Sequence, residues 1–297
     1  AQAVLIATAI ASFIGTICMA LLANYPFALA PGLGLNAYFA YTVCGSMGYS
    51  WQIALFAVFV EGLIFIVLSL TNVREAIFNA IPLQLKKGVS VGIGLFIAFI
   101  GLQNAGIVVN NDSTLVSIVD FTADFHTSGI SALLAVIGIF IIAVLYVKKV
   151  KGAILIGIFA TWILGIICQL TGLYVPAPDA GFYSLIPSGI VSAPASLAPT
   201  LFKMDFSVIG SLNFLVVVFA FLFVDIFDTL GTLIGCATKA DMLDKDGKLP
   251  GIKGALMADA VGTTVGACFG TSTITTFVES SSGIAEGGRT GLTSIVS

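Results

Sequence analysis

Two aspartates stand three residues apart inside a stretch that is otherwise apolar, FVDIFDTLGT at residues 223–232. A charge at the centre of a membrane helix costs about 2.5–3.5 kcal/mol, so each carboxylate placed there needs a reason. Asp225 and Asp228 share one stripe of a helix with Thr229 and Thr232, while the other faces carry Phe, Leu, Val and Ile. We expect this stripe to face protein or a water-filled cavity. A hydrogen-bonded contact between helices is the alternative, which carries more weight for Asp228, since that residue would then only brace Asp225.

A third carboxylate, Glu279, follows the β-branched and hydroxyl run TSTITTF and precedes the small-residue run SSSGIAEGG. An extended piece followed by a helix leaves free N–H groups at the helix start, where an anionic or hydrogen-bonding ligand can be held. Glu279 is expected at the mouth of that helix, with a capping role as the alternative. Asn36, in GLGLNAYF, is expected to play the matching part earlier in the chain, because an amide both donates and accepts; a turn or cap position is the alternative.

The remaining ionisable residues inside or near apolar segments give weaker signals. Glu61 and Asp259 each stand alone on a span, and we expect a structural hydrogen bond for each rather than a direct role. Glu286 and Arg289 are expected to be solvated or capping. The only histidine, His126, lies in a predicted external loop, which argues against a histidine proton relay.

The composition places the 297-residue chain in a membrane: 58% of residues are hydrophobic, only 9% are charged, and the mean hydropathy is +1.10. The net charge is −3, with no basic block, so nucleic-acid binding has no support. The five cysteines lie singly in apolar segments without CxxC spacing, so we expect packing residues rather than disulfides or metal ligands. No cofactor is expected, and no nucleophile–base pair, metal set or phosphate loop suggests an enzyme.

Stretches of about 20 mostly apolar residues predict membrane-spanning helices. They fall near 3–23, 51–71, 88–109, 129–147, 152–173, 211–236 and 254–270. Lys and Arg concentrate in the loops 72–87, 147–152 and 237–253, which are therefore predicted to be cytoplasmic.

Two further segments, 24–46 and 270–290, are too interrupted by Pro, Gly and polar residues for continuous spans. They are predicted to be broken spans that cross the membrane in opposite directions. Inverted repeats with discontinuous elements have this layout in secondary transporters. The sequence thus predicts an all-α polytopic membrane protein of the inverted-repeat transporter type, with two discontinuous strand–helix spans.

Four long segments in the same order carry a family resemblance: ALAPGLGLNAYFAY, GIGLFIAFIGLQNAGIV, FVDIFDTLGTLIG and TSTITTFVESSSGIAEGGRTGLT. They resemble the signature segments of AzgA-type purine permeases, the hypoxanthine, guanine and adenine branch of the nucleobase–cation symporters, and the resemblance covers essentially the whole chain. It implies fourteen spans in two inverted repeats of seven, divided between a core and a gate domain. On that pattern the chain begins at the family's second span and stops as the eleventh starts.

The resemblance also implies how the chain divides and assembles. Residues 1–71 would form the first part of the core, 72–210 part of the gate, and 211–297 the second part of the core. The protein would be a multi-pass protein of the plasma membrane, in the lipid bilayer, and usually a homodimer. It would take up purine nucleobases with a proton as the coupling ion, sodium being the second choice.

Individual residues take roles by the same resemblance. Asp225 matches an acidic position that contacts the nucleobase and is coupled to protonation, and Glu279 matches the acidic position that binds the purine ring. The backbone at Phe277 and Val278 lies beside Glu279, and Asn36 matches a substrate-contacting asparagine. Proton coupling is assigned to Asp225, Glu279 and Asp228, and supporting positions to Gly34, Thr229 and Thr276.

The predicted mechanism follows from purine chemistry. Two carboxylates and an asparagine can pair with the donors and acceptors on a purine edge, and a phenylalanine can contact the ring face. Proton and substrate binding would favour each other, and the core would move against the gate. Two alternatives remain open. One is an anion exchanger of the related fold, which three carboxylates would disfavour, and the other is a membrane channel or scaffold without coupled transport.

Overall fold

A computed structural model of the chain describes residues 2–80, 82–187, 189, 193–208, 210–245 and 247–297. These residues divide into two compact units, one formed by Ala1–Ile93 with Pro194–Ser297 and the other by Gly94–Ala193. Helix α5 (Leu83–Asn104) runs from the first unit into the second. The second unit lies within the segment predicted as gate, while the first holds both segments predicted as core.

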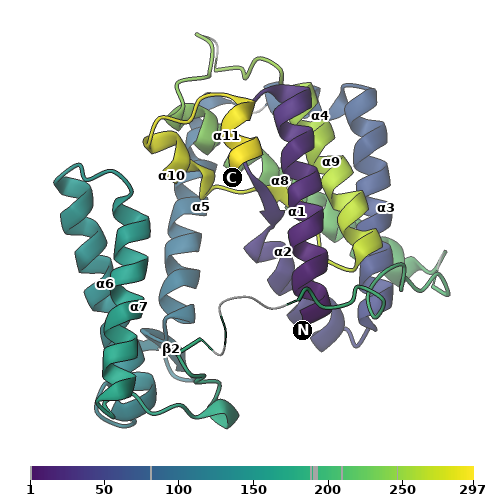
Figure 1. The fold of residues 1–297 in the computed structure, drawn as a ribbon. Coiled ribbons are helices and arrows are strands. Elements are labelled where there is room, and N and C mark those ends of the chain that lie inside the picture. Colours follow the sequence, from purple (N-terminus) through teal and green to yellow (C-terminus); the bar gives the residue numbers. More distant parts are fainter. Residues whose placement is uncertain (1, 81, 188, 190–192, 209, 246) are drawn as a thin grey trace. The chain divides into compact units, whose positions relative to one another are not determined.

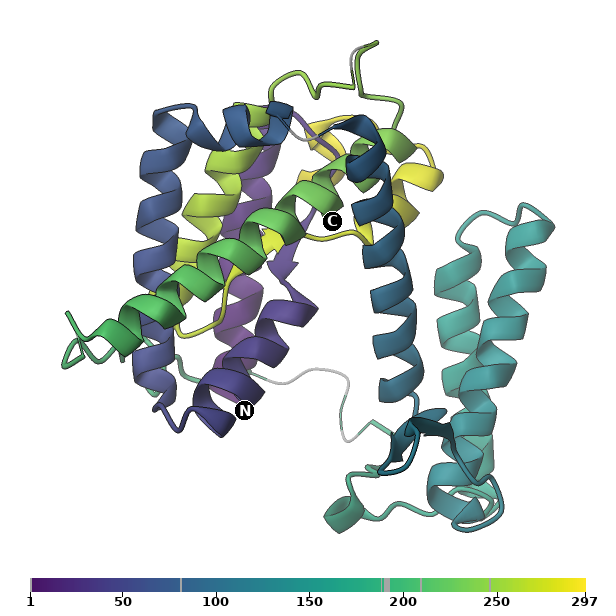
Figure 2. The same ribbon diagram turned by 180° about the vertical axis from the view of Figure 1, so that it is seen from behind.

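The first unit is a helical bundle around two short strands (Figures 1 and 2). Its elements are α1 (Gln2–Ala23), β1 (Leu29–Pro31), α2 (Leu33–Ala37), the π-helix η1 (Tyr38–Ser46), α3 (Trp51–Leu70), α4 (Val73–Ala80), α8 (Leu212–Lys239), α9 (Ile252–Phe269), β4 (Ile274–Thr276), α10 (Ser280–Ala285) and α11 (Gly291–Val296). Helix α9 packs against α1 on one side and α3 on the other, and α8 runs obliquely across the bundle (Figure 2).

The second unit is built on two helices that lie side by side (Figure 1). It contains the hairpin β2 (Val108–Asn111) and β3 (Leu115–Ile118), the π-helical turn η2 (Phe125–Gly129), α6 (Ile130–Val147), α7 (Ala153–Leu170) and the 3₁₀ turn η3 (Pro178–Ala180). His126 lies in η2 and is exposed, as predicted.

Helices occupy all seven predicted spans. Five of the helical segments are long and apolar enough to cross a membrane: Gln2–Ala23, Trp51–Leu70, Phe125–Val147, Ala153–Leu170 and Leu212–Lys239. The span predicted at 88–109 is displaced, because α5 starts at Leu83 and ends at Asn104. Gly106 then adopts a φ of +69°, and the apolar residues that follow enter strand β2 instead of continuing the helix.

The two predicted broken spans are confirmed as an extended piece followed by a helix. Strands β1 and β4 pair antiparallel, with Leu29 opposite Thr276 and Pro31 opposite Ile274. This pairing agrees with the opposite directions predicted for the two segments. Because no water reaches backbone groups in a membrane interior, each strand satisfies the other's N–H and C=O groups there.

The five cysteines are unpaired and at least partly buried, as expected for packing residues. Two pairs of glycines spaced four residues apart, Gly262 with Gly266 and Gly88 with Gly92, differ in their surroundings. An added Cβ at Gly262 or Gly266 would come within 2.9 Å of Ile274 in β4, so these glycines admit the strand close to α9. At Gly88 and Gly92, an added Cβ would meet no described atom within 4 Å.

Candidate functional site

The polar residues of the first unit surround the antiparallel pair of β1 and β4, which we call the strand crossing. Backbone hydrogen bonds extend the pairing at both ends: Gly32 N donates to Thr273 O at 3.3 Å, and Phe277 N donates to Ala28 O at 2.9 Å. Helix α2 starts two residues after the end of β1, and α10 starts four residues after the end of β4. The crossing therefore fixes where the starts of both helices lie.

Four ionisable side chains gather behind the crossing and are almost completely buried. They come from four helices: Glu61 of α3, Arg74 of α4, Asp225 of α8 and Asp259 of α9. The three carboxylates have no exposed surface, and Arg74 is only 3% exposed. Buried charges of this kind need partners, because taking them out of water costs several kcal/mol per ion.

Arg74 and Asp259 form an ion pair, with Nη2 and Oδ2 3.2 Å apart. Nη1 of Arg74 also donates to the carbonyl oxygen of Leu256 at 3.0 Å, and the guanidinium lies 3.9 Å from the ring centre of Phe65. The other oxygen of Asp259 accepts the backbone N–H of Thr276 at 3.1 Å. Arg74 was counted among the charges of a cytoplasmic loop, but the structure places it in the protein interior as the partner of Asp259.

The hydroxyl group of Thr229 connects two of the carboxylates to β4. Its Oγ1 lies 3.1 Å from Asp225 Oδ1, 3.0 Å from Asp259 Oδ2 and 2.9 Å from the hydroxyl of Thr275. Thr229 follows Asp225 by one helical turn, so the predicted polar stripe of α8 does face protein. Its partners are side chains of α9 and β4.

Glu61 is tied to the same strand region through Thr273, whose hydroxyl donates to Glu61 Oε2 at 3.0 Å. The other oxygen, Oε1, has no hydrogen-bond partner in the described part of the chain, and the same holds for Oδ2 of Asp225. Thr229, which binds Asp225, contacts Thr275, two residues along the strand from Thr273. Thr273 and Thr275, two residues apart in the β4 region, thus form hydrogen bonds with Glu61 and Thr229 respectively.

Asp228 and Glu279 occupy a second position, at the two helix starts. Oδ2 of Asp228 lies 2.9 Å from the point where a Cβ on Gly32 would sit, so this carboxylate is packed against the residue that precedes α2. Glu279 is the residue before α10, and its side chain makes no capping hydrogen bond. Glu279 is exposed, whereas Asp228 is half-buried.

The remaining predicted site residues also lie at or near the crossing. Asn36 is in α2, half-buried, and its side-chain oxygen accepts a hydrogen bond from the hydroxyl of Ser272, so it bridges the two broken spans instead of capping a helix. Gly34 lies in the same helix. The carbonyl oxygens of Phe277 and Val278 are each 3.8 Å from the thiol sulfur of Cys236.

Thr276, the last residue of β4, has one polar group with a hydrogen-bond partner and one without. Its backbone N–H binds Asp259, as described above, while its buried hydroxyl has no partner among the described residues. The structure therefore places Asp228 against Gly32, before α2, and Glu279 directly before α10, while Asn36 contacts Ser272. Asp225, Thr229 and Thr276 belong to the buried network around Asp259.

Three residues of the buried network were not singled out for a direct role: Glu61, Asp259 and Arg74. They come from three different helices, so spacing along the chain carries no sign that they meet. For Glu61 and Asp259 the available signal was the cost of a carboxylate in an apolar span, which requires a partner from another helix.

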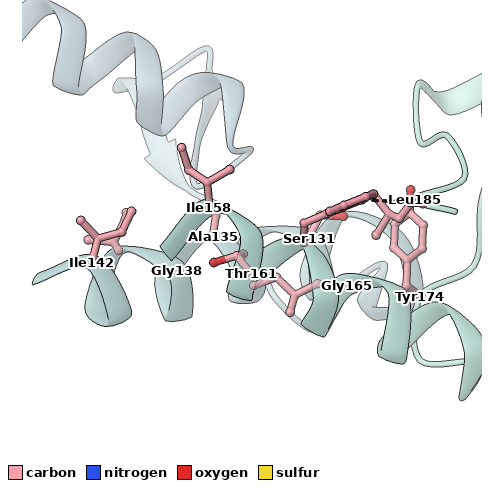
Figure 3. Close-up of a pocket in the computed structure, with 12 residues that line it drawn as sticks. Ser131, Ala135, Gly138, Ile142, Ile158, Thr161, Gly165, Tyr174 and Leu185 are labelled. Atoms are coloured by element: carbon pink, nitrogen blue, oxygen red, sulfur yellow. Dashed lines mark hydrogen bonds between the residues drawn. The ribbon is translucent and has the colours of Figure 1, made fainter. Parts of the chain in front are cut away.

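A pocket lies elsewhere, in the second unit between α6 and α7 (Figure 3), with a volume of about 440 Å³. Its lining includes Ser131, Gly138, Thr161, Gly165 and Tyr174, and it contains no charged residue. The indole N–H of Trp162 donates to Leu185 O at 2.9 Å at one end. An apolar groove without charged groups offers little to a polar solute, so we place the candidate site at the strand crossing.

Comparison with known proteins agrees with the membrane architecture. A model of a permease family, Xan_ur_permease, matches residues 1–297. The chain is 52% identical over 296 residues to a protein of Methanocaldococcus jannaschii described as a permease, covering 99% of this chain and 63% of that protein. It is 46% identical to the guanine/hypoxanthine permease PbuO of Bacillus subtilis (97% and 63% covered) and 40% identical to the adenine permease AdeP of Escherichia coli (99% and 62% covered).

The chain thus spans about 63% of the length of the curated relatives it matches. Among solved structures, the transmembrane domain of the cyanobacterial bicarbonate transporter BicA is similar, with a TM-score of 0.56 and 16% identity, over 99% of this chain and 75% of that one. At this identity the likeness establishes a helical membrane transporter fold.

Proposed function

Because the chain belongs to the xanthine/uracil permease family, a family of multi-pass membrane transporters and not of enzymes, we propose that the whole protein imports purine nucleobases across the plasma membrane by proton symport. The names of the relatives support this substrate class: two are guanine/hypoxanthine permeases of B. subtilis and one is an adenine permease of E. coli. Guanine, hypoxanthine and adenine are the substrates to test first.

The observation that supports the proposal is the position of two carboxylates at helices that follow the paired strands: Asp228 packs against Gly32, before α2, and Glu279 directly precedes α10. Asn36 of α2 contacts Ser272 next to the same strands. A purine presents ring N–H donors and nitrogen or carbonyl acceptors on one flat edge. Carboxylates accept from such donors, and an amide both donates and accepts. Glu279 has no capping bond to give up before it binds a ligand.

The proposed binding set is Asn36, Asp225, Phe277, Val278 and Glu279, supported by Gly34, Thr229 and Thr276. In the described conformation Asp225 has no exposed surface, so a nucleobase reaches it only when the network around it opens. Asp228 has more access and lies nearer Glu279. Proton coupling is assigned to Asp225, Asp228 and Glu279 together.

The proposed transport cycle is alternating access, with a core that carries both broken spans moving against a gate. The inverted repeats, the core–gate division and a homodimer in the bilayer belong to this proposal. The similarity in fold to a bicarbonate transporter domain supports the general architecture.

Uptake of radiolabelled purines tests the proposal directly. The full-length protein would be expressed in cells that lack purine uptake, and entry of hypoxanthine, guanine, adenine, xanthine and uracil would be measured with and without a protonophore. We expect purine uptake that the protonophore abolishes. Glu279→Gln should reduce it to background, because an amide cannot replace a carboxylate as a double acceptor.

Asp112→Asn is the matched control. Asp112 is an exposed carboxylate in the turn of the β2–β3 hairpin, and its loss should leave uptake unchanged. If a protein that reaches the membrane takes up no nucleobase, the proposal is wrong, and exchange of small anions becomes the function to measure. Uptake that persists with the protonophore would reject proton symport while keeping the substrate class.

A further inference from the structure

The buried network has fewer hydrogen-bond donors than its carboxylate oxygens require. Asp259 receives the Arg74 guanidinium and the Thr276 N–H, and Glu61 Oε2 receives the Thr273 hydroxyl. The Thr229 hydroxyl has a single hydrogen, yet it lies within hydrogen-bond distance of both Asp225 Oδ1 and Asp259 Oδ2. One of these two contacts therefore lacks a hydrogen unless a carboxyl group supplies it.

Two oxygens receive no donor at all among the described residues, Glu61 Oε1 and Asp225 Oδ2. Both belong to side chains without exposed surface, and one strand region holds both carboxyl groups, Glu61 through Thr273 and Asp225 through Thr229 and Thr275. An unpartnered buried acceptor costs about 1–3 kcal/mol, and more when it is charged. Two ionised carboxylates in one dry site also repel each other, so such a pair keeps a proton.

We propose that Glu61 and Asp225 share one proton and form the proton-carrying site of the transporter. A single hydrogen between Oε1 and Oδ2 gives both unpartnered oxygens a bond and removes the repulsion between the two groups. The proton belongs to the pair, since strongly interacting carboxyls titrate together. The role in coupling rests on the proposed proton symport; the existence of the shared proton does not.

The surrounding charges determine where the proton sits. Asp259 faces the pair from α9 but stays ionised, because Arg74 of α4 is bound to it. Asp228, one turn along α8, adds further negative charge near Asp225, and Glu279 acts on Asp228. One guanidinium thus faces three carboxylates in the network and two more beside it, an imbalance that one proton reduces.

A metal ion fits this position less well than a proton. Hard cations such as Ca²⁺ take six or more oxygen ligands, whereas only two carboxylate oxygens of the described network are without a partner. In the described part of the chain, no group of three or more His, Cys, Asp or Glu side chains is arranged to hold an ion.

The β4 region links this pair to the proposed substrate position. Thr273 binds Glu61, Thr275 contacts the Thr229 hydroxyl, and the strand ends three residues before Glu279. A ligand that moves Glu279 would pull on the threonines that hold the pair. Proton affinity and substrate affinity are then coupled through one strand, and the coupling must be reciprocal.

Infrared difference spectroscopy on the purified full-length protein tests the shared proton without any transported solute. A protonated carboxyl group gives a C=O stretching band that shifts in D₂O. We expect one such band in the wild type at neutral pH and its complete loss in both Glu61→Gln and Asp225→Asn, because either amide donates to the remaining carboxylate and replaces the proton. Asp228→Asn, one turn away on the same helix, should keep the band.

The exchange variant Glu61→Asp/Asp225→Glu guards against misfolding, since it keeps two carboxyls in the same space and should retain the band. The inference is wrong if the wild type has no band, if the band survives in either single variant, or if Asp228→Asn removes it. It is also wrong if Na⁺, but not K⁺, removes the band, because the site would then bind sodium. A band with the expected behaviour in a protein that transports no nucleobase would support the proton site and reject the proposed function.

Discussion

Replacing Arg74 by methionine should destabilise the protein more than the same change at Arg289, the other arginine of the chain. The substitution keeps an apolar side chain of similar length but leaves the buried carboxylate of Asp259 without its ion-pair partner at 3.2 Å. Breaking a buried pair by removing one member costs about 3–5 kcal/mol. Because each 1.4 kcal/mol is a factor of ten, the ratio of folded to unfolded protein should fall by about two to four orders of magnitude.

The free energy of unfolding would be measured by denaturant titration of the full-length protein in mixed micelles. Arg289→Met is the matched control: this arginine is exposed and only donates to carbonyl oxygens, including Ile284 O, so the loss should be about 1 kcal/mol. The double variant Arg74→Met/Asp259→Asn should recover stability, since no uncompensated charge remains. A double-mutant cycle should return a coupling energy of about 1–3 kcal/mol.

The reasoning fails if Arg74→Met unfolds within about 1 kcal/mol of the wild type, or if the effects of the two single variants simply add. Either result would mean that water or another cation reaches Asp259, and that the network is not closed. The count of donors behind the shared proton would then have to be revised as well.

Two further variants probe the packing and hydrogen bonding around the site. Gly62→Ala should lower the free energy of unfolding by about 1–3 kcal/mol, because the added Cβ would lie 2.9 Å from the backbone nitrogen of Thr264 in α9. Gly92→Ala is the control, since its added Cβ meets no described atom within 4 Å. Equal stability of the two variants would contradict the expectation. Thr229→Val has nearly the same shape but lacks the hydroxyl, so it should cost about 1–3 kcal/mol by the same denaturant titration, and a neutral effect would show that the hydroxyl is not needed.

Much of the fold was predictable because the membrane constrains it. Apolar length alone located seven helices, and Pro, Gly and polar interruptions located the two broken spans. Residue-level details depended on tertiary context. The apolar run 105–109 looked like the end of a span, but the positive φ of Gly106 directs it into a hairpin.

The site was less accessible from the sequence. Helical spacing showed that Asp225 and Thr229 share a stripe, and the structure confirms that the stripe faces protein. Spacing along one helix cannot show which residue of another helix lies opposite. Glu61, Asp259 and Arg74 come from three different helices, so their meeting depends on the packing of α3, α4 and α9.

The pairing of β1 with β4 has a consequence for biosynthesis. The paired residues, such as Leu29 and Thr276, are about 250 residues apart in the chain. At 5–20 residues per second, the ribosome adds that length in about 10–50 s. During this interval the first broken span has no partner for its backbone groups, which lipid cannot satisfy. Residues 24–46 must therefore stay at the translocon, in water or bound to an insertion chaperone until the second broken span has been made. This interval is the step of assembly at which misfolding should be most frequent.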